Sequence, residues 1–281
     1  MKFGVFMFPT DYSIKPAELA RAAEERGFES LFVPEHTHIP ASRRSPWPGG
    51  SELPQEYYHL VDPFVALASA AAVTERLVVG TAICLVPQHH PITLAKQVAS
   101  LDYVSGGRFV FGIGAGWNEE EMQHHGVDPA TRWQVMRESV LAMKAIWTED
   151  EAQFQGRFVR FEPIWSWPKP VQKPHPPVYV GGHGNRVLQR VVDYADGWMP
   201  IYAREPDLVG RVQELQRLAR EKGRGPVPVT VLGVPPRPEA LETCARAGVE
   251  RCLFWLRPTP AEETLPYLDQ LASLAREFAA A

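Results

Sequence analysis

The feature that most constrains the fold is a regular alternation of short apolar runs with longer helical segments. Seven of eight such runs are rich in Val, Ile, Leu and Phe, as expected of strands that are covered on both faces, and the remaining run is Gly-Trp-Met-Pro. These predicted strands occupy residues 3–8, 30–33, 77–82, 109–111, 178–180, 197–200, 229–232 and 251–255. A chain that repeats this pattern must pair its strands in parallel, because each strand is followed by a crossover segment.

The segments between the runs predict helices. The second of these begins at Asp62-Pro63, with Asp as N-cap and Pro in the first turn. The predicted helices cover residues 16–26, 63–72, 93–104, 133–147, 186–195, 206–222, 238–247 and 261–278. Eight such units predict an α/β fold, a (β/α)₈ TIM barrel in one domain over residues 1–281. An insertion at about 148–177 precedes the fifth strand, and its residues 154–161 predict a small hairpin.

Composition excludes several classes of function. A net charge of -4 gives no reason to expect nucleic acid or an anionic membrane as partner. No run is long and apolar enough to span a bilayer, and the first residues fit a buried strand better than a signal peptide. Cys84, Cys244 and Cys252 are far apart and odd in number, which indicates neither a disulfide framework nor a zinc motif. We therefore expect a cytoplasmic protein.

The stretch Gly106–Asn118, GGRFVFGIGAGWN, combines a turn, a buried strand and a glycine-rich exit. Gly112, Gly114 and Gly116 alternate, so one face of the strand end carries no side chains. A flat ligand could lie against that face; tight packing at the rim of a barrel is the alternative.

Residues 181–185, Gly-Gly-His-Gly-Asn, lie between a predicted strand and a predicted helix. Free backbone N–H groups at such a helix start attract phosphate, and barrels commonly bind phosphate around their later strands. We therefore predict a phosphate site here, against the alternative of a tight turn without ligand.

Glu35, His36 and His38 follow the second strand, at the end where a barrel builds its active site. His36 could be an acid, a base or a hydrogen-bond donor to a redox cofactor. The histidines could also be polar rim residues or, least favoured, ligands of a hydrolytic metal, which would need further ligands at other strand ends. We therefore predict no metal site.

Aromatic residues follow two other predicted strands. Trp117 and Trp198 could line a flat ring or an apolar substrate, or they could pack in the core. The polar segment 39–60 is too long for an ordinary connection and predicts a functional loop or lid. Residues 119–121, three consecutive glutamates, are interpreted as a solvated helix start.

Three stretches together resemble the bacterial luciferase-like monooxygenase superfamily, and within it the coenzyme F420-dependent oxidoreductases. They are LVVGTAICLVPQHHPITLAKQVASLDYVSGGRFVFGIGAGWNEEE, FQGRFVRFEPIWSWPKPVQKPHPPVYVGG and the element DGWMP. The resemblance covers nearly the whole chain. It implies a TIM-type barrel with an insertion before strand five and a flavin-like ring over the carboxyl ends of the strands.

The resemblance also assigns residues. Glu35 and His36 match the acidic-His pair of deazaflavin enzymes, in which the His lies near the reactive centre, so the resemblance implies that both are catalytic residues. A cis peptide bond at Ala82–Ile83 would support the ring. The predicted cofactor-binding residues are Thr81, Ala82, Ile83, Gly112, Gly114, Trp117, Gly181, Gly182, His183, Gly184, Asn185 and Trp198.

From the resemblance we expect an oxidoreductase that transfers hydride between coenzyme F420 and a small organic substrate. FMN is the alternative cofactor, and an FMN-dependent monooxygenase is the alternative function. A metal-dependent hydrolase built on His36 and His38 is a further alternative. Because relatives are commonly dimers, we also expect a homodimer.

Overall fold

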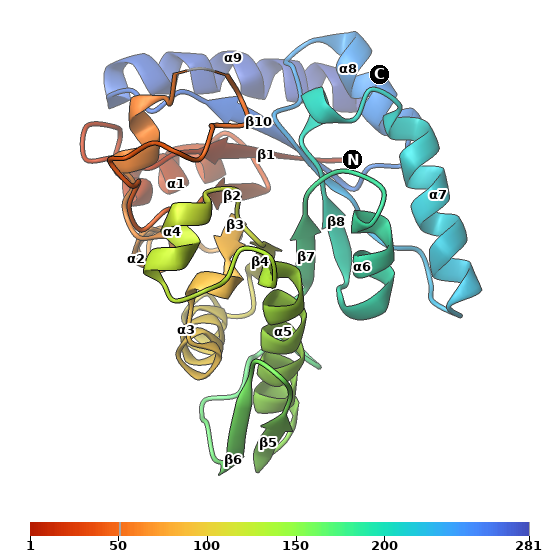
Figure 1. The fold of residues 1–281 in the computed structure, drawn as a ribbon. Coiled ribbons are helices and arrows are strands. Elements are labelled where there is room, and N and C mark those ends of the chain that lie inside the picture. Colours follow the sequence, from red (N-terminus) through yellow and green to blue (C-terminus); the bar gives the residue numbers. More distant parts are fainter. Residues whose placement is uncertain (51, 281) are drawn as a thin grey trace.

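The computed structural model describes residues 1–50 and 52–280. Eight parallel strands form one sheet in the order β8-β7-β4-β3-β2-β1-β10-β9, and helices surround it (Figure 1). The strands of this sheet are β1 (Lys2–Met7), β2 (Ser30–Val33), β3 (Val78–Leu85), β4 (Phe109–Gly114), β7 (Val178–Gly181), β8 (Gly197–Met199), β9 (Thr230–Leu232) and β10 (Arg251–Leu256). The predicted TIM-barrel fold is confirmed.

The helices follow the strands in the predicted alternation. They are α1 (Pro16–Glu25), α2 (Pro63–Ala71), α3 (Pro91–Val104), α4 (Glu119–His124), α5 (Arg132–Thr148), α6 (Val187–Tyr194), α7 (Leu208–Glu221), α8 (Pro238–Arg246) and α9 (Ala261–Ala280). Short 3₁₀ turns are η1 (Gln55–Tyr58), η2 (Val86–Gln88) and η3 (Tyr202–Arg204). Asp62 caps α2 as predicted, since its side chain accepts a hydrogen bond from the backbone N–H of Val65.

The barrel is closed by few backbone contacts between β8 and β9. β8 and β9 meet through two isolated parallel bridges, Trp198 with Val229 and Ile201 with Leu232. All other neighbouring strands are joined by ladders, of which the β3–β4 ladder shifts its register between Thr81 and Cys84. The barrel is therefore nearly closed, and its carboxyl ends form one ring.

The predicted hairpin is present as β5 (Ala152–Gln155) and β6 (Arg160–Ile164), which pair antiparallel. It follows α5 and lies at the far end of that helix, away from the barrel strands (Figure 1).

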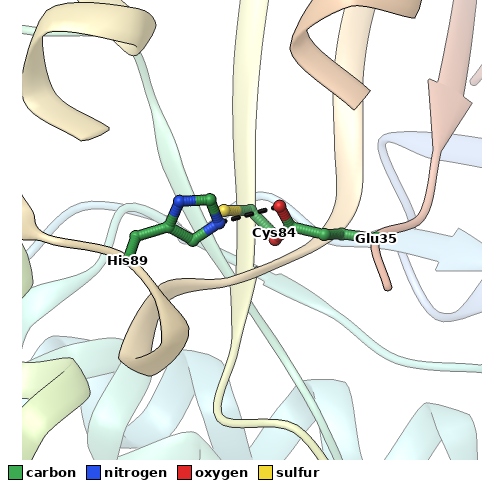
Figure 2. A group of neighbouring side chains, drawn as sticks. All are labelled: Glu35, Cys84 and His89. Atoms are coloured by element: carbon green, nitrogen blue, oxygen red, sulfur yellow. Dashed lines mark hydrogen bonds and ion pairs between the residues drawn. The ribbon is translucent and has the colours of Figure 1, made fainter. Parts of the chain in front are cut away.

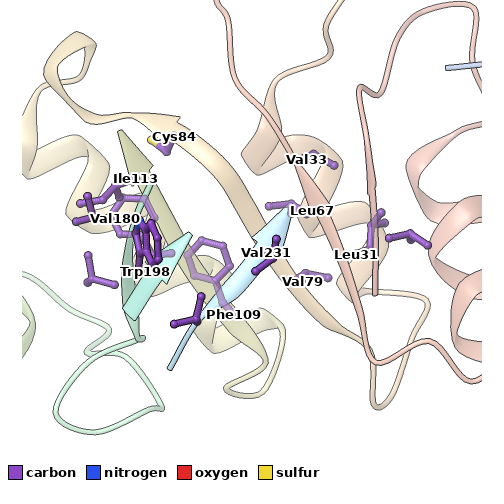
Figure 3. Close-up of a cluster of buried hydrophobic side chains, with 14 of the residues drawn as sticks. Leu31, Val33, Leu67, Val79, Cys84, Phe109, Ile113, Val180, Trp198 and Val231 are labelled. Atoms are coloured by element: carbon purple, nitrogen blue, oxygen red, sulfur yellow. The ribbon is translucent and has the colours of Figure 1, made fainter. Parts of the chain in front are cut away.

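Two apolar clusters stabilise the barrel. The larger lies between the strands and the helices and includes Leu31, Val79, Phe109 and Trp198 (Figure 3). The smaller contains Phe6, Phe32, Val110, Tyr179, Leu253 and their neighbours, which fill the inside of the barrel. Because successive side chains of a strand point to opposite faces, each strand contributes residues to both clusters.

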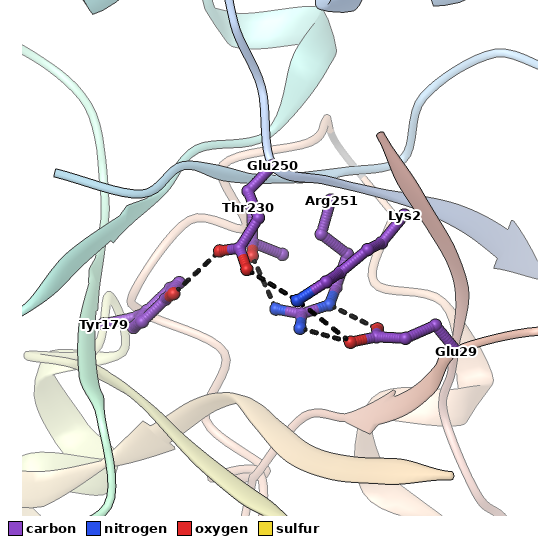
Figure 4. Close-up of polar contacts among 6 residues, drawn as sticks. All are labelled: Lys2, Glu29, Tyr179, Thr230, Glu250 and Arg251. Carbon is purple, nitrogen blue, oxygen red and sulfur yellow. Dashed lines mark hydrogen bonds and ion pairs between the residues drawn. The ribbon is translucent and has the colours of Figure 1, made fainter. Parts of the chain in front are cut away.

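A polar cluster lies where the first residues of several strands meet (Figure 4). Arg251 is buried and donates from Nε and Nη2 to the two carboxylate oxygens of Glu29, each at 2.7 Å. Its Nη1 donates to Thr230 Oγ1 at 3.1 Å. Burial alone would raise the pKa of Glu29, but the hydrogen bonds and charge of Arg251 lower it on balance.

We predict that Arg251→Met lowers the free energy of unfolding by roughly 3–5 kcal/mol at pH 7, because Glu29 then stays charged and keeps only its longer contact with Lys2, at 3.7 Å. Since pairing depresses the folded-state pKa of Glu29, this contribution is complete above the ordinary carboxyl pKa and is lost as the pH falls through the lowered value. Urea denaturation at several pH values measures both effects.

The control is Arg26→Met, which removes a more exposed ion pair with Asp269. We expect it to cost at most about 1 kcal/mol. Equal losses in the two variants would contradict the role given to Arg251.

Candidate active site

A cavity of about 270 Å³ opens at the carboxyl ends of the barrel strands. Its wall is mainly apolar, with a few polar groups that include His36, His183 and Arg204. The aromatic residues that line it are Phe6, Phe8, Trp47, Tyr57, Trp117, Trp133 and Trp255. An apolar, aromatic hollow with a few polar groups is typical of a small-molecule or cofactor site.

Ile83 is central to one wall of this cavity. The peptide bond between Ala82 and Ile83 is cis, as the sequence resemblance implied. A Cβ atom on Gly114 would lie 1.9 Å from Ile83 Cδ1, and one on Gly181 would lie 2.7 Å from Ile83 Cγ2. The space that these two glycines leave free is thus occupied by the Ile83 side chain, so the glycine pattern of β4 serves close packing at the rim.

Thr81 and Gly112 lie just beneath this wall. Thr81 is fully buried and donates a hydrogen bond to the carbonyl oxygen of Gly112 at 2.7 Å, which ties β3 to β4. A Cβ on Gly112 would lie 2.0 Å from the carbonyl oxygen of Thr81. Neither residue lines the cavity, whereas Ala82, Ile83 and Gly114 do.

Glu35 lies at the edge of the cavity, and both of its carboxylate oxygens have partners. Figure 2 shows its contact with His89. One oxygen pairs with His89 Nε2 at 2.7 Å, and the other accepts the backbone N–H of Leu85 at 2.5 Å. Burial would raise the pKa of Glu35, but the contacts with His89 and the Leu85 N–H lower it on balance. Glu35 therefore anchors the exit of β3.

The thiol of Cys84 completes this buried group. The ligand atoms of Glu35, Cys84 and His89 all lie within 4.8 Å of one another, a spacing that would admit a metal ion. Glu35, however, already pairs with His89 and with the Leu85 N–H. Burial, followed by the charge of Glu35, raises the pKa of the Cys84 thiol well above its usual range. Because Glu35 and Cys84 are buried and Glu35 already has partners for both oxygens, the group is interpreted as a packing anchor.

His36 faces the cavity and is held from behind by α4. Its Nδ1 lies 2.8 Å from Glu121 Oε2, and the Glu121 side chain is fully buried. If Glu121 is ionised, Nδ1 must carry the proton of this bond, which leaves Nε2 as the nitrogen available to a ligand. Glu121 Oε1 is buried and has no hydrogen-bond partner among the described residues.

The interpretation of residues 119–121 as a solvated helix start was wrong for two of the three. Glu119 is exposed, but Glu120 and Glu121 are buried. Asn118 caps α4 by accepting the N–H of Glu121. An Asn followed three residues later by Glu is a capping pattern, and it places Glu121 at a defined position in the first turn. That spacing was the available signal, although it could not show that the carboxylate reaches His36.

His36 and His38 point to different partners. His38 Nε2 lies 2.8 Å from His124 Nδ1, outside the set of residues that line the cavity. His36 and His38 therefore do not converge on one point, which removes the support for a metal site shared by the two.

The segment 39–60 covers the cavity through Trp47, Pro48 and Tyr57. Glu120 fastens it: its carboxylate accepts hydrogen bonds from Ser42 Oγ, from Arg44 Nε at 3.0 Å and from the Ser45 N–H at 2.7 Å. On the other side, Arg204 donates to the carbonyl oxygen of Pro48 at 3.0 Å.

Residues 181–185 divide into two parts. Gly181, Gly182 and His183 line the cavity, whereas Gly184 and Asn185 are exposed beyond it. Gly182 and Gly184 have φ values of 130° and 83°, which favour glycine. His183 Nδ1 lies 2.8 Å from a carboxylate oxygen of Glu205. Burial lowers the pKa of His183, against the opposite effect of Glu205.

The two aromatic residues that were predicted for the site, Trp117 and Trp198, lie in different environments. Trp117 lines the cavity and its ring centroid lies 5.8 Å from that of His36. Trp198 is fully buried in the outer core, where its Nε1 donates to the carbonyl oxygen of Gly182 at 3.2 Å. The neighbouring Met199 lines the cavity in its place, because side chains alternate along β8. Sequence reasoning did not single out Tyr57, Arg204 and Trp255, which also line the cavity.

Comparison with known proteins identifies the family. The model of the luciferase-like monooxygenases matches residues 1–253. The chain therefore belongs to the luciferase-like monooxygenase family and is an oxidoreductase of that family.

Among the described residues, none of the helices has the length and apolar character needed to cross a membrane.

Individual relatives differ in cofactor. An uncharacterized protein of Mycobacterium tuberculosis is 42% identical over 97% of this chain and 98% of its own length. F420-dependent glucose-6-phosphate dehydrogenase of Nakamurella multipartita is 28% identical over 68% of this chain and 53% of its own. FMNH₂-dependent dimethylsulfone monooxygenase of Pseudomonas putida is 35% identical over 45% of this chain and 35% of its own length.

Solved structures share the fold. Monooxygenase RslO1 of Streptomyces bottropensis has a TM-score of 0.78 at 21% identity, covering 99% of this chain and all of its own. An F420-dependent secondary alcohol dehydrogenase in complex with an F420-acetone adduct has a TM-score of 0.78 at 19% identity, covering 99% of each chain.

We predict that Glu120→Gln loosens the segment 39–60. Losing charge-assisted hydrogen bonds of about 1.5–3 kcal/mol each raises the open population roughly tenfold or more. Trypsin then cleaves faster after Arg43 or Arg44, which mass spectrometry detects. Glu119→Gln, at the exposed neighbour, is the matched control. Equal cleavage rates in the two variants would show that Glu120 does not fasten the segment.

Proposed function

We propose that this protein is a coenzyme F420-dependent oxidoreductase that transfers hydride between the deazaflavin and a small organic substrate. The observation that carries this proposal is the placement of His36 in the cavity wall, with its Nδ1 held by the buried Glu121. Oxidation of an alcohol to a carbonyl releases a proton together with the hydride, so hydride chemistry requires a group that accepts this proton. His36 Nε2 is such a group.

The residues of the cavity suit a flat cofactor ring. Ala82 and Ile83 offer an apolar surface, and Gly114 and Gly181 make room for the Ile83 side chain that forms it. Gly182 and His183 line the cavity, and in this proposal they contact the cofactor phosphate. When bound, the deazaflavin supplies the hydride acceptor or donor, and the protein supplies binding and orientation.

In this proposal the side chains of the protein accept and donate the substrate proton. Glu121 holds the Nδ1 proton of His36, which leaves the Nε2 lone pair free to accept the hydroxyl proton of an alcohol. The imidazolium that forms is stabilised by the Glu121 carboxylate. In the reverse direction the same Nε2 donates the proton to the carbonyl oxygen of the substrate.

Glu35 has a different task in this proposal. Because its oxygens are taken by His89 and by the N–H of Leu85, it has no place for a substrate proton. We therefore reassign Glu35 from the catalytic role expected from the sequence to a positioning role, in which it holds the strand exit that carries Ile83.

The substrate side of the cavity is aromatic. Phe8 packs against both Tyr57 and Trp255, with ring centroids 4.9 Å apart for Phe8 and Tyr57 and 5.6 Å apart for Phe8 and Trp255. Such a wall favours small apolar alcohols, ketones, imines or alkenes over charged substrates.

The test of the cofactor is a fluorescence titration of the purified protein with F420 and, separately, with FMN. We expect F420 to bind at least tenfold more tightly. The reverse preference would overturn the proposal in favour of an FMN-dependent monooxygenase, for which oxygen consumption with FMNH₂ is the next assay.

We predict that His36→Gln lowers turnover by roughly 10²–10⁴-fold while the dissociation constant for F420 changes little, because general acid–base catalysis has this magnitude. Turnover is measured with the best hydride partner found among alcohols, imines and activated alkenes. His90→Gln, an exposed His outside the cavity, is the control. Unchanged turnover in His36→Gln would remove this residue from catalysis.

We further predict that Glu121→Gln lowers turnover by about ten- to a hundredfold, as is usual for groups that orient a catalytic side chain. If Glu121 acts through His36, adding Glu121→Gln to the His36→Gln variant costs nothing more. Losses that multiply in the double variant would instead indicate an independent structural role.

A further inference from the structure

A group of arginines lies beside the loop 181–185, and neither the predicted site nor the proposed chemistry uses it. Arg132 begins α5, Arg186 is the N-cap of α6, and Arg190 lies one turn into that helix. Burial lowers the pKa of Arg190, and the charges of Arg186 and Arg132 lower it further, against the opposite effect of Tyr194. The positive charges of Arg186 and Arg132 therefore both act on the Arg190 guanidinium.

The group adjoins the cavity through Trp133. The Arg190 guanidinium lies over the Trp133 ring, 3.7 Å from its centroid. Trp133 itself lines the cavity, and a Cβ on Gly182 would lie 3.8 Å from the Trp133 ring. A ligand whose phosphate contacts Gly182 would therefore continue outward past Trp133 toward the arginines.

The positive charge of the group is not compensated. Within residues 1–50 and 52–280, Arg132, Arg186 and Arg190 form no ion pair with a carboxylate, whereas the nearby Arg211 pairs with Glu205 and Glu214. Arg132 Nε and the Tyr194 hydroxyl are buried and have no hydrogen-bond partner within that same part of the chain. Buried donors without acceptors are costly, so an anionic ligand would supply what the fold lacks.

We infer that Arg132, Arg186 and Arg190 form a second anion-binding subsite, beyond the phosphate, for the carboxylates of the cofactor tail. Guanidinium groups bind carboxylates through paired hydrogen bonds and are the usual choice for this purpose. Coenzyme F420 extends from its phosphate into a tail of glutamates, whereas FMN ends at its phosphate. The inference rests on the proposed function, and it makes this subsite a determinant of the preference for F420.

The experiment is a fluorescence titration of the full-length protein with natural F420 and with the same deazaflavin phospholactate lacking the glutamates. We expect natural F420 to bind at least tenfold more tightly, with a difference that shrinks as salt is raised. Arg186→Gln should weaken the binding of natural F420 at least fivefold, and the double variant Arg186→Gln/Arg190→Gln should weaken it at least tenfold. Both should leave the affinity for the form without glutamates within twofold.

Arg217→Gln is the matched control, since Arg217 is an exposed arginine of α7 paired with Glu221. We expect it to leave both affinities unchanged. Arg186 is exposed, so its single variant tests the subsite without disturbing the packing of Arg190 on Trp133. Equal affinity of the wild-type protein for the two deazaflavins, or equal losses for both in the variants, would overturn the subsite alone. Failure of the wild-type protein to bind either deazaflavin would overturn the proposed function as well.

Discussion

The parallel pairing of all barrel strands is the constraint on which the site depends. It brings the exits of β2, β3, β4 and β7 to one rim, although up to about 150 residues separate them along the chain. Contacts between neighbouring exits then fix the rim. Glu35 after β2 holds Leu85 at the end of β3, and Glu121 after β4 holds His36 after β2. His36 and the exit of β3 are thereby each held by a residue from another βα unit.

The two ends of the barrel use buried charge differently. At the amino ends, Arg251 and Glu29 are paired by two hydrogen bonds, and Thr230 takes a further donor of Arg251. Such a satisfied group holds the strands and offers nothing to a ligand. At the carboxyl ends, Glu121 keeps one buried oxygen without a partner among the described residues, and Arg132 keeps a donor in the same condition. Glu121 and Arg132 therefore each leave a polar atom at the carboxyl ends that a ligand could satisfy.

The sequence predicted the barrel because strand and helix periodicity are local properties, and eight repeats leave few ways to close. The hairpin at 154–161 and the cap at Asp62 were predictable for the same reason. Side-chain contacts at the rim were not. Whether Trp198 or Met199 faces the cavity depends on the register of β8 against its neighbours, which local patterns do not give.

The role of Glu121 was missed for a related reason. A run of glutamates at a helix start is typically solvated, and only the fold of residues 35–38 over α4 buries it. Similarly, the contact of Arg204 with Pro48 joins residues 156 positions apart. The resemblance to a known family supplied the cis bond at Ala82–Ile83, which no pattern of propensity would have suggested.

The central claim is that a deazaflavin ring lies against Ile83 with its reactive carbon toward His36. A crystal structure of the protein with oxidised F420 tests it most directly. The account predicts the ring over Ala82–Ile83, the phosphate at Gly182 and His183, and His36 Nε2 directed to the space beside the ring, with Nδ1 still on Glu121. A ring bound elsewhere, or a His36 that has left Glu121 and turned away from the cavity, would contradict the account.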